Sequence, residues 1–523
     1  MDGNGLPPTP IKSIGVPMPM VDGPEKISGR AQYTADFYDH DALVGCIKRA
    51  DVAHAHILSV DISAAEALPG VHAVITGSET DEGHGVLPVS RTELPIAFDR
   101  VRYKGEPVAA VAADSIEIAK AACDLITVEY DELPAYFTAA DSMAEGTVDL
   151  HDHRPGNIER HVDYEIGDAD AGFDAADLIH ETEYHCAEVC QVQTEPHAAF
   201  AEWDAERDEL TVRASTQVPY YVHLMLSKIL KMPKSKIRVI KPYLGGGFGA
   251  RTEALNVELI TAMLARRVRG TVRTVISRED TFITHRGRPE QTVKIRMGMT
   301  KDGKITAVDC QTIQRGGGHS GYGIVTILYS GSMLFAIYDL QNVRYDGKRV
   351  LTNTPPCGAF RGHGTVNVRH AFENVMDEMA IKLGLDPFVV RRANLITEMG
   401  HVANDLWVNS YGLPECLDIV EEASGWKDRK GKLAPGKGLG MACSHYVSGA
   451  SKPVNWTGEP HATINLKLNF DGTIVILTGA SEIGQGSSTI LVQCVAEVLG
   501  IDPTRVKIVT TDSRVTPKDN GSY

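Results

Sequence analysis

The sequence lacks both a basic patch and a long apolar run. Its 523 residues hold 52 Lys and Arg against 68 Asp and Glu, a formal net charge of −16, with no extended Lys/Arg run. Proteins that bind nucleic acid usually gather basic side chains on one face, so we expect no nucleic acid among the partners. The most apolar stretches, such as residues 324–328 and 490–499, are far shorter than the roughly 18 residues of a membrane-spanning helix. We therefore expect no membrane span.

Closely spaced cysteines are also missing. The nine cysteines are odd in number and scattered. Even Cys186 and Cys190 have a spacing that fits neither a zinc ribbon nor the ligand run of an iron–sulfur cluster. We expect reduced, mostly buried thiols. The N-terminus has neither the basic start nor the apolar segment of a secretory signal, so we expect a cytoplasmic protein.

What the sequence does contain is a globular composition with abundant glycine. Hydrophobic residues make up 43% and charged residues 23%, and 49 residues are glycine. The Asp-Gly pairs at 302–303 and 471–472 lie between alternating stretches and predict two β-hairpins. The apolar spacing of residues 371–383 predicts a helix that ends at Gly384.

Three glycine-bearing loops are candidates for a binding site. The first, residues 245–249 (GGGFG), lies between a predicted strand at 237–241 and a predicted helix at 254–266. This geometry can point backbone amides at an anion or a cofactor. The loop is neither a dinucleotide fingerprint nor a P-loop, and taken alone it is equally consistent with a tight turn.

The second loop, residues 358–364 (GAFRGHG), places Arg361 and His363 among glycines behind a Pro-Pro entry. A lone arginine in a loop is more often a solvated charge than a ligand contact. The third, residues 484–488 (GQGSS), precedes a predicted helix at 489–499. Its amides could contact a phosphate or a pterin, or serve only as a helix cap.

Together and in this order, the three loops resemble the molybdenum-binding large subunit of the xanthine oxidase family. Other shared stretches occur in family order along nearly the whole chain: residues 101–113, 128–134, 195–196, 215–217, 277–279 and 384–394. The resemblance implies an α+β fold, in which an N-terminal α/β hammerhead domain precedes molybdopterin-binding domains of the xanthine oxidase/aldehyde oxidoreductase type.

The resemblance also implies a division of the chain. We expect an extended lead over residues 1–20, the hammerhead domain over 21–145 and a linker over 146–160. A first molybdopterin-binding domain would then cover 161–405, and a second, truncated one 406–523. Family members carry their general-base glutamate beyond the position where this sequence stops. We therefore expect either a fragment or a remainder carried by a separate polypeptide, and no activity from the chain alone.

Residue roles follow from the same resemblance. The cofactor implied is molybdopterin cytosine dinucleotide with molybdenum, and the protein supplies no metal ligand. Gln217 matches the glutamine that hydrogen-bonds an oxo ligand of the metal, and Gln485 matches a pterin contact. The implied cofactor-binding residues are Gln217, Gly246, Gly247, Phe248, Gly249, Arg361, Gly362, Gly484, Gln485, Gly486 and Ser522.

Several positions depart from members that oxidise purines. Thr252, Tyr329 and His363 stand where those members carry a glutamate, an arginine and a phenylalanine. A purine pocket is therefore disfavoured. The carbon monoxide dehydrogenase branch is also disfavoured, because Gly362 stands where that branch has cysteine and Cys357 lies four residues before Arg361.

Within the family, residues 322–329, 352–365, 444–460 and 516–523 resemble the α subunit of 4-hydroxybenzoyl-CoA reductases. This resemblance implies reductive removal of the para-hydroxyl of 4-hydroxybenzoyl-CoA, giving benzoyl-CoA in anaerobic aromatic degradation. Tyr329 and His363 would be proton donors or hydrogen-bond partners of the substrate, with Gln217 as the third catalytic residue. Histidine titrates near neutral pH, which suits this role. Tyr329 is alternatively a core tyrosine in an apolar run.

The implied partners are a small subunit with [2Fe–2S] clusters and a medium subunit with FAD, in a dimer of heterotrimers. The sequence contains no motif for either group, consistent with that division of labour. Two other functions stay open. One is an oxidative molybdenum hydroxylase of the same family, acting on an N-heterocycle or an aldehyde. The other is a non-catalytic subunit that holds the cofactor.

Overall fold

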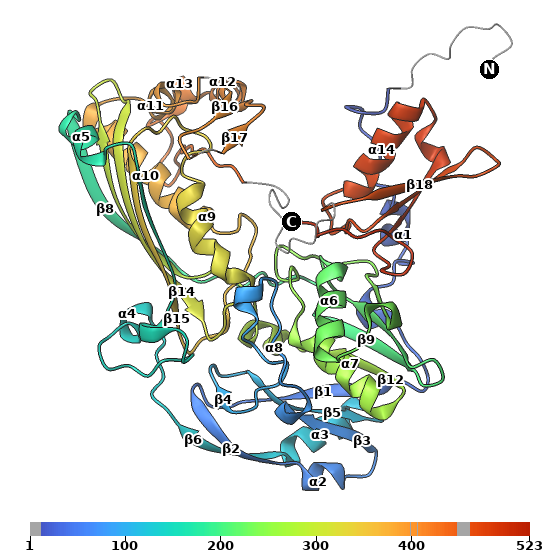
Figure 1. Ribbon diagram of the computed structural model, residues 1–523. Helices are drawn as coiled ribbons and strands as arrows, with labels where there is room; N and C mark the ends of the chain where they lie inside the picture. Colours follow the sequence, from blue (N-terminus) through green and yellow to red (C-terminus); the bar gives the residue numbers. More distant parts are fainter. Residues whose placement is uncertain (1–11, 398, 405, 447–460) are drawn as a thin grey trace, which may run out of the picture.

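The computed structural model describes residues 12–397, 399–404, 406–446 and 461–523 (Figure 1). Its largest sheet has seven strands in the order β11-β10-β9-β12-β1-β5-β3. The bounds are β1 Leu43–Arg49, β3 Val71–Thr76, β5 Pro107–Ala113, β9 Ala198–Asp204, β10 Glu209–Ala214, β11 Ile237–Ile240 and β12 Thr271–Val275. The parallel pairing of β1 with β12 joins strands from both sides of the predicted linker into one sheet.

The seven-stranded sheet is covered by helices that carry its apolar core. The helices α6 (Pro219–Ile229) and α7 (Asn256–Val268) pack on it through Val222, Leu226 and Ile260. Strand β5 is buried along its whole length, and α3 (Ile116–Leu125) packs against it. A small antiparallel sheet, β4-β2-β6, also belongs to the N-terminal region (β2 Ala55–Asp61, β4 Arg100–Val101, β6 Thr127–Glu132).

A second, five-stranded sheet has the order β7-β15-β14-β13-β8. Its strands are β7 Ile158–Ile166, β8 Leu178–Cys186, β13 Gln291–Met299, β14 Ile305–Gly317 and β15 Val343–Leu351. The long helix α10 (Val366–Leu383) buries Phe372, Val375 and Met379 against it. This helix starts at Val366, before the predicted residue 371. It ends at Gly384 as predicted, and Gly384 has a left-handed backbone conformation with a φ of 69°.

The third sheet, β18-β19-β20, packs against α14 (Ser487–Leu499). Its strands are β18 Ile464–Leu468, β19 Ile474–Thr478 and β20 Val506–Thr510. Both predicted Asp-Gly hairpins are confirmed, because β13 pairs with β14 and β18 with β19 in antiparallel register. The remaining elements are the two-stranded sheet of β16 Gly400–His401 and β17 Trp407–Val408 and the helices α1 Gly23–Ile27, α2 Ser63–Glu66, α4 Ala139–Ser142, α5 Ala169–Asp174, α8 Arg278–Ile283, α9 Thr326–Ser332, α11 Pro387–Ala393, α12 Leu413–Ser424 and α13 Trp426–Arg429.

Residues 13–21 pack against α14, a contact that the sequence did not reveal. Figure 1 shows the first described residues beside α14. The carboxylate of Glu497 accepts hydrogen bonds from the backbone N–H groups of Ser13 and Ile14, at 3.0 and 2.6 Å. The side-chain amide of Gln493 donates to the carbonyls of Ser13 and Val16. We call residues 13–21 the N-terminal strap.

No helix among the residues described is long and apolar enough to cross a membrane.

Replacing Gln493 by Ala should loosen the strap. The buried amide bonds two backbone carbonyls, and leaving such groups without partners costs about 1–3 kcal/mol. We expect a drop of that size in the free energy of unfolding, together with faster proteolysis before residue 22. The exposed Gln311 on β14 provides the control, and Gln311→Ala should change neither readout. Equal proteolysis of the two variants would contradict the strap's role.

Candidate functional site

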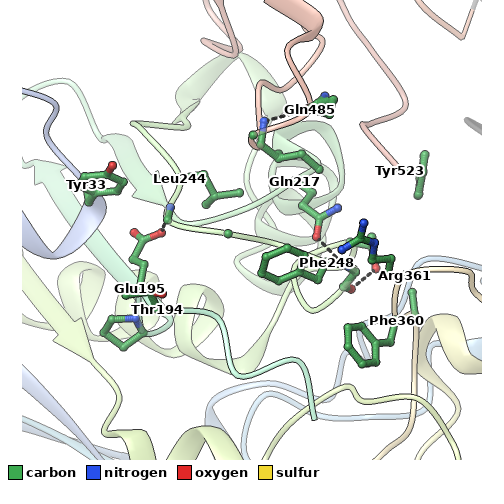
Figure 2. A pocket seen from close by; sticks show the side chains of 18 of the residues that line it. Tyr33, Thr194, Glu195, Gln217, Leu244, Phe248, Phe360, Arg361, Gln485 and Tyr523 are labelled. Carbon is green, nitrogen blue, oxygen red and sulfur yellow. Dashed lines mark hydrogen bonds between the residues drawn. The ribbon is translucent and has the colours of Figure 1, made fainter. Parts of the chain in front are cut away.

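A cavity of about 1060 Å³ lies where the predicted glycine loops meet. Its walls come from the N-terminal region, the segment 194–196, Gln217, the glycine loops and the last residue. Figure 2 shows this cavity with Gln217 at its centre. The lining residues are Lys26, Tyr33, Ala35, Asp36, Thr194, Glu195, Pro196, Gln217, Leu244, Gly245, Gly246, Phe248, Gly249, Thr252, Ala359, Phe360, Arg361, Gly362, His363, Tyr446, Ile483, Gly484, Gln485 and Tyr523.

The loop 245–249 has glycines because other segments approach it closely. A Cβ atom on Gly247 would lie 2.5 Å from Oε1 of Gln217, and one on Gly249 would lie 2.3 Å from the carbonyl oxygen of Ala359. Gly249 also has a φ of 102°, which side-chain-bearing residues avoid. The glycines therefore let this loop pass between two other walls of the cavity.

The orientation of the Gln217 side chain is fixed by two hydrogen bonds. Gln217 is buried, and its Oε1 accepts from the N–H of Gly249 at 2.9 Å. Its Nε2 donates to the carbonyl of Ser522 at 3.0 Å. Because an amide nitrogen carries two hydrogens, one N–H of Gln217 is still available. The group that Gln217 can offer to a ligand in the cavity is thus a hydrogen-bond donor.

Phe248 holds an unfavourable backbone conformation at the cavity wall. Its φ is 54°, and its side chain is 44% exposed. Its carbonyl accepts a hydrogen bond from the N–H of Arg361 at 2.9 Å, so the first two glycine loops are bonded directly to each other (Figure 2). Left-handed conformations of non-glycine residues cluster at functional sites. Arg361 itself is exposed and lines the cavity.

The third loop differs from the sequence-based interpretation in one respect. The N–H groups of Gly484, Gly486 and Ser488 donate to the carboxylate of Glu482, at 2.8 to 3.1 Å. Burial raises the pKa of Glu482, but these N–H groups outweigh it and hold the pKa below its usual value. The amides that we expected to face a phosphate or a pterin are therefore occupied by the chain's own carboxylate.

Gln485 nevertheless lines the cavity, with an exposed side chain. Its Oε1 accepts from the N–H of Ile483 at 2.7 Å, and its Nε2 donates to the carbonyl of Ser481 at 2.9 Å. Ser522 is bonded to the same segment, since its hydroxyl donates to the carbonyl of Ser481 at 2.7 Å. Through Ser522, Gln217 and the third loop form one connected wall.

His363 lines the cavity but does not titrate near neutral pH. It is buried, and burial lowers its pKa to about 3, with a smaller contribution from the positive charge of Arg349. The ring is neutral at pH 7. A neutral imidazole does not fit the expected proton donor that titrates near neutrality, because desolvation disfavours its charged form. The other role expected of His363, a hydrogen-bond partner of the substrate, stays a prediction.

Tyr329 lies outside the cavity lining and contacts His363 edge-on, with ring centroids 5.5 Å apart. Burial raises the pKa of the Tyr329 phenol, so this hydroxyl stays protonated at neutral pH. Of the other expected site residues, Gly247, Gly486 and Ser522 do not line the cavity themselves, although residues next to them in the chain do.

Sequence reasoning missed several walls of the cavity. Lys26, Tyr33 and Asp36 come from the N-terminal region, where no motif marked them. Tyr446 and Tyr523 add aromatic surface to the cavity. Both lie in stretches, 444–460 and 516–523, that had been singled out by their resemblance to a known family, although the two side chains themselves had not been predicted to line the site.

The cavity offers a ligand hydrogen-bond donors and closely packed backbone. Among the residues described, no three or more His, Cys, Asp or Glu side chains are placed to hold a metal ion. The cavity offers the amide N–H of Gln217, the closely packed glycine loop and a volume of about 1060 Å³, which is at the upper limit for small-molecule and cofactor sites.

The backbone strain at Phe248 predicts that glycine is a more stable replacement there than alanine, the reverse of the usual order. Phe248→Gly should be more stable than Phe248→Ala by about 1 kcal/mol, because only glycine adopts a φ of 54° without a steric penalty. Phe282 on α8 is similarly exposed, at 48%, and provides the matched control. There Ala should be the more stable replacement. Urea unfolding gives the free energy of unfolding of the four variants. If Ala is the more stable replacement at both positions, the backbone of Phe248 is not strained.

The buried imidazole of His363 predicts a change in acid stability. Its folded pKa of about 3 lies below the ordinary 6.5, so the unfolded chain binds this proton first. Stability should therefore fall as the pH drops from about 6.5 towards 3. His363→Phe should reduce this slope by up to about 1.4 kcal/mol per pH unit. Urea unfolding between pH 6.5 and 4.5 measures it, with His40→Phe at an exposed site as control.

Three family models match the chain. Residues 28–134 match the aldehyde oxidase and xanthine dehydrogenase a/b hammerhead domain. Residues 150–395 and 419–523 match two molybdopterin cofactor-binding domains. Among solved structures, the aldehyde oxidoreductase of Desulfovibrio gigas superposes with a TM-score of 0.89 at 24% identity, over 98% of this chain and 57% of that one. The expected α+β fold, with a hammerhead domain before molybdopterin-binding domains, is confirmed.

Curated relatives agree. The xanthine dehydrogenase molybdenum-binding subunit of Escherichia coli O157:H7 is 31% identical over 525 residues, covering 96% of this chain and 68% of that protein. The nicotinate dehydrogenase large molybdopterin subunit of Eubacterium barkeri is 33% identical over 403 residues, covering 77% and 94%. The nicotine 6-hydroxylase large subunit of Paenarthrobacter nicotinovorans is 29% identical, covering 95% and 63%. The chain thus belongs to the xanthine dehydrogenase and aldehyde oxidase family of molybdenum-binding subunits.

Proposed function

We propose that the protein is the molybdenum-containing catalytic subunit of an oxidative hydroxylase that acts on an N-heterocycle or an aldehyde. The observation that carries this proposal is the fixed amide of Gln217. Gly249 and Ser522 orient it so that a hydrogen-bond donor is offered at the cavity. The names of the relatives, which include dehydrogenases and a hydroxylase of nicotine, favour the oxidative direction over the reductive one.

The residues of the cavity fit the expected cofactor, for which we propose the molybdopterin cytosine dinucleotide form. When bound, this group supplies two-electron redox chemistry and the oxygen atom transferred to the substrate. The chain's residues hold and polarise it. Gln217 would donate to an oxygen on the metal, while Phe248 and its glycines form the adjacent wall. Gln485 and the segment around Ser522 would contact the pterin.

The substrate side of the cavity is aromatic and carries no carboxylate in the expected place. Thr252 lines it, and its hydroxyl is bonded to the carbonyl of Gly249 at 2.9 Å. The rings of Phe360, His363, Tyr446 and Tyr523 line the cavity as well. Flat aromatic walls bind planar rings through stacking and edge contacts. A planar N-heterocycle other than a purine fits this wall best.

A second candidate is reduction of 4-hydroxybenzoyl-CoA. It is favoured by the direct contact of Tyr329 with His363, the two residues that the resemblance assigned to that substrate. In this reaction the protonated phenol of Tyr329, which lies outside the cavity lining, would act on the substrate through the ring of His363 that it contacts.

We also propose the partners that the family organisation implies. A small subunit with [2Fe–2S] clusters and a medium subunit with FAD would receive the electrons, in a dimer of heterotrimers. The chain spans 68% of the length of the Escherichia coli relative and 57% of the Desulfovibrio gigas chain. Activity is therefore expected of the assembled complex. The domain limits at 21–145, 161–405 and 406–523 stay predictions.

The deciding experiment compares the two reactions on the native complex. Nicotinate, quinoline and benzaldehyde are offered with an oxidising dye in water labelled with ¹⁸O, and 4-hydroxybenzoyl-CoA is offered with a reduced viologen. We expect dye reduction and one ¹⁸O atom in the product of the first reaction. Loss of the hydroxyl from the thioester instead would establish the reductase. Neither reaction, with molybdenum present, would indicate a subunit that only holds the cofactor.

Tyr329→Phe separates the same two functions within the protein. A hydroxylase should keep its turnover within about twofold, because Tyr329 lies outside the cavity lining. A reductase that takes its proton from this phenol should lose at least about tenfold, equivalent to about 1.4 kcal/mol.

A further inference from the structure

One wall of the cavity contains a buried ion pair. The side chains of Glu195 and Arg251 are 6% and 0% exposed, and Nη1 of Arg251 lies 2.5 Å from Oε2 of Glu195. The same carboxylate oxygen accepts from the N–H of Gly245 at 2.8 Å, as Figure 2 shows. One oxygen atom thus joins the first residue of the glycine loop to an arginine just beyond its end.

The guanidinium adds a second set of bonds to the same segment. Its Nη2 donates to the carbonyls of Glu195 and Pro196, at 2.5 and 3.2 Å. Arginine presents its donors in a rigid planar fork, so several acceptors are fixed at once. The loop 245–251 is therefore held at both ends against residues 195–196. We call this arrangement the Glu195–Arg251 clasp.

The clasp continues to the central glutamine of the site. The carbonyl of Arg251 accepts from the backbone N–H of Gln217 at 2.8 Å. The N–H of Gly249, inside the clasped loop, fixes Oε1 of Gln217 at 2.9 Å. Both the backbone and the side chain of Gln217 are thus bonded to the segment that the ion pair holds.

A buried ion pair is weak support for stability, because desolvation of the charges offsets much of their attraction. Its retention is better explained by the geometry that it imposes. A loop of glycines has little conformational preference of its own. External bonds must therefore select its conformation, and within this wall the clasp bonds it at both ends.

We propose that Glu195 and Arg251 are positioning residues, which set the place of the glycine loop and the direction of the Gln217 amide in the cavity. The inference rests on the proposed function in one point, the assignment of Gln217 to the cofactor. Neither residue is assigned a contact with the cofactor or the substrate. Each acts through Gly245, Gly249 and Gln217.

The test uses Glu195→Gln in the native complex. Glu373 provides the matched control, since it is buried and paired with Arg391 at 3.0 Å away from this cavity. Amide hydrogen exchange of residues 244–252 should rise at least tenfold in Glu195→Gln and stay at the wild-type value in Glu373→Gln. Per bound molybdenum, kcat should fall at least tenfold with KM within twofold, and the Mo(V) electron paramagnetic resonance g-values should shift.

In Glu195→Gln, wild-type exchange of residues 244–252 would overturn the clasp, and wild-type Mo(V) g-values would overturn its role in directing the Gln217 amide. Should that variant fail to fold, Arg251→Lys keeps the charge opposite Glu195 but loses the fork to the carbonyls of Glu195 and Pro196. It should show the same loop-confined exchange to a smaller degree, and no change would likewise overturn the proposal. The exchange measurement requires neither substrate nor cofactor, so it decides the clasp even if the wild type oxidises no heterocycle or aldehyde.

Discussion

The cavity depends on a single steric constraint, the close passage of the backbone at residues 245–249 past other walls. A Cβ atom at Gly247 or Gly249 would overlap Gln217 or Ala359. Because Gly247 and Gly249 have no side chains, the loop can pass close to both Gln217 and the loop 358–364, while Phe248 between them turns its ring to the cavity lining. Its left-handed conformation follows from the same path, and the surrounding hydrogen bonds maintain it.

The distribution of charge divides the site into a polar and an aromatic part. Around Gln217 the chain offers donors from amides, whereas around His363 it offers neutral rings. Glu195 also lines the cavity, with its carboxylate paired to the buried guanidinium of Arg251. A ligand therefore meets both hydrogen-bond donors and the surfaces of neutral rings in one cavity.

The sequence predicted those structural elements that are determined by residues close together in the chain. Asp471-Gly472 forms its hairpin and Gly384 ends α10, since turn chemistry and capping depend on neighbours in the chain. The glycine loops could be recognised because each is a short, continuous stretch of sequence. The sequence could not show that Glu482 occupies the amides of the third loop, nor that desolvation keeps His363 neutral. Both depend on the packing of distant segments. Lys26 and Tyr33 were missed because their contacts are long-range and no local pattern marks them.

The N-terminal strap has a consequence for how the protein is made. Ser13 and Gln493 are bonded across 480 positions of the chain, so the strap can form only after α14 has been synthesised. Contacts between such distant segments are slow to form. The walls given by Lys26 and Gln485 come from equally distant segments, so the complete lining of the cavity forms late in folding.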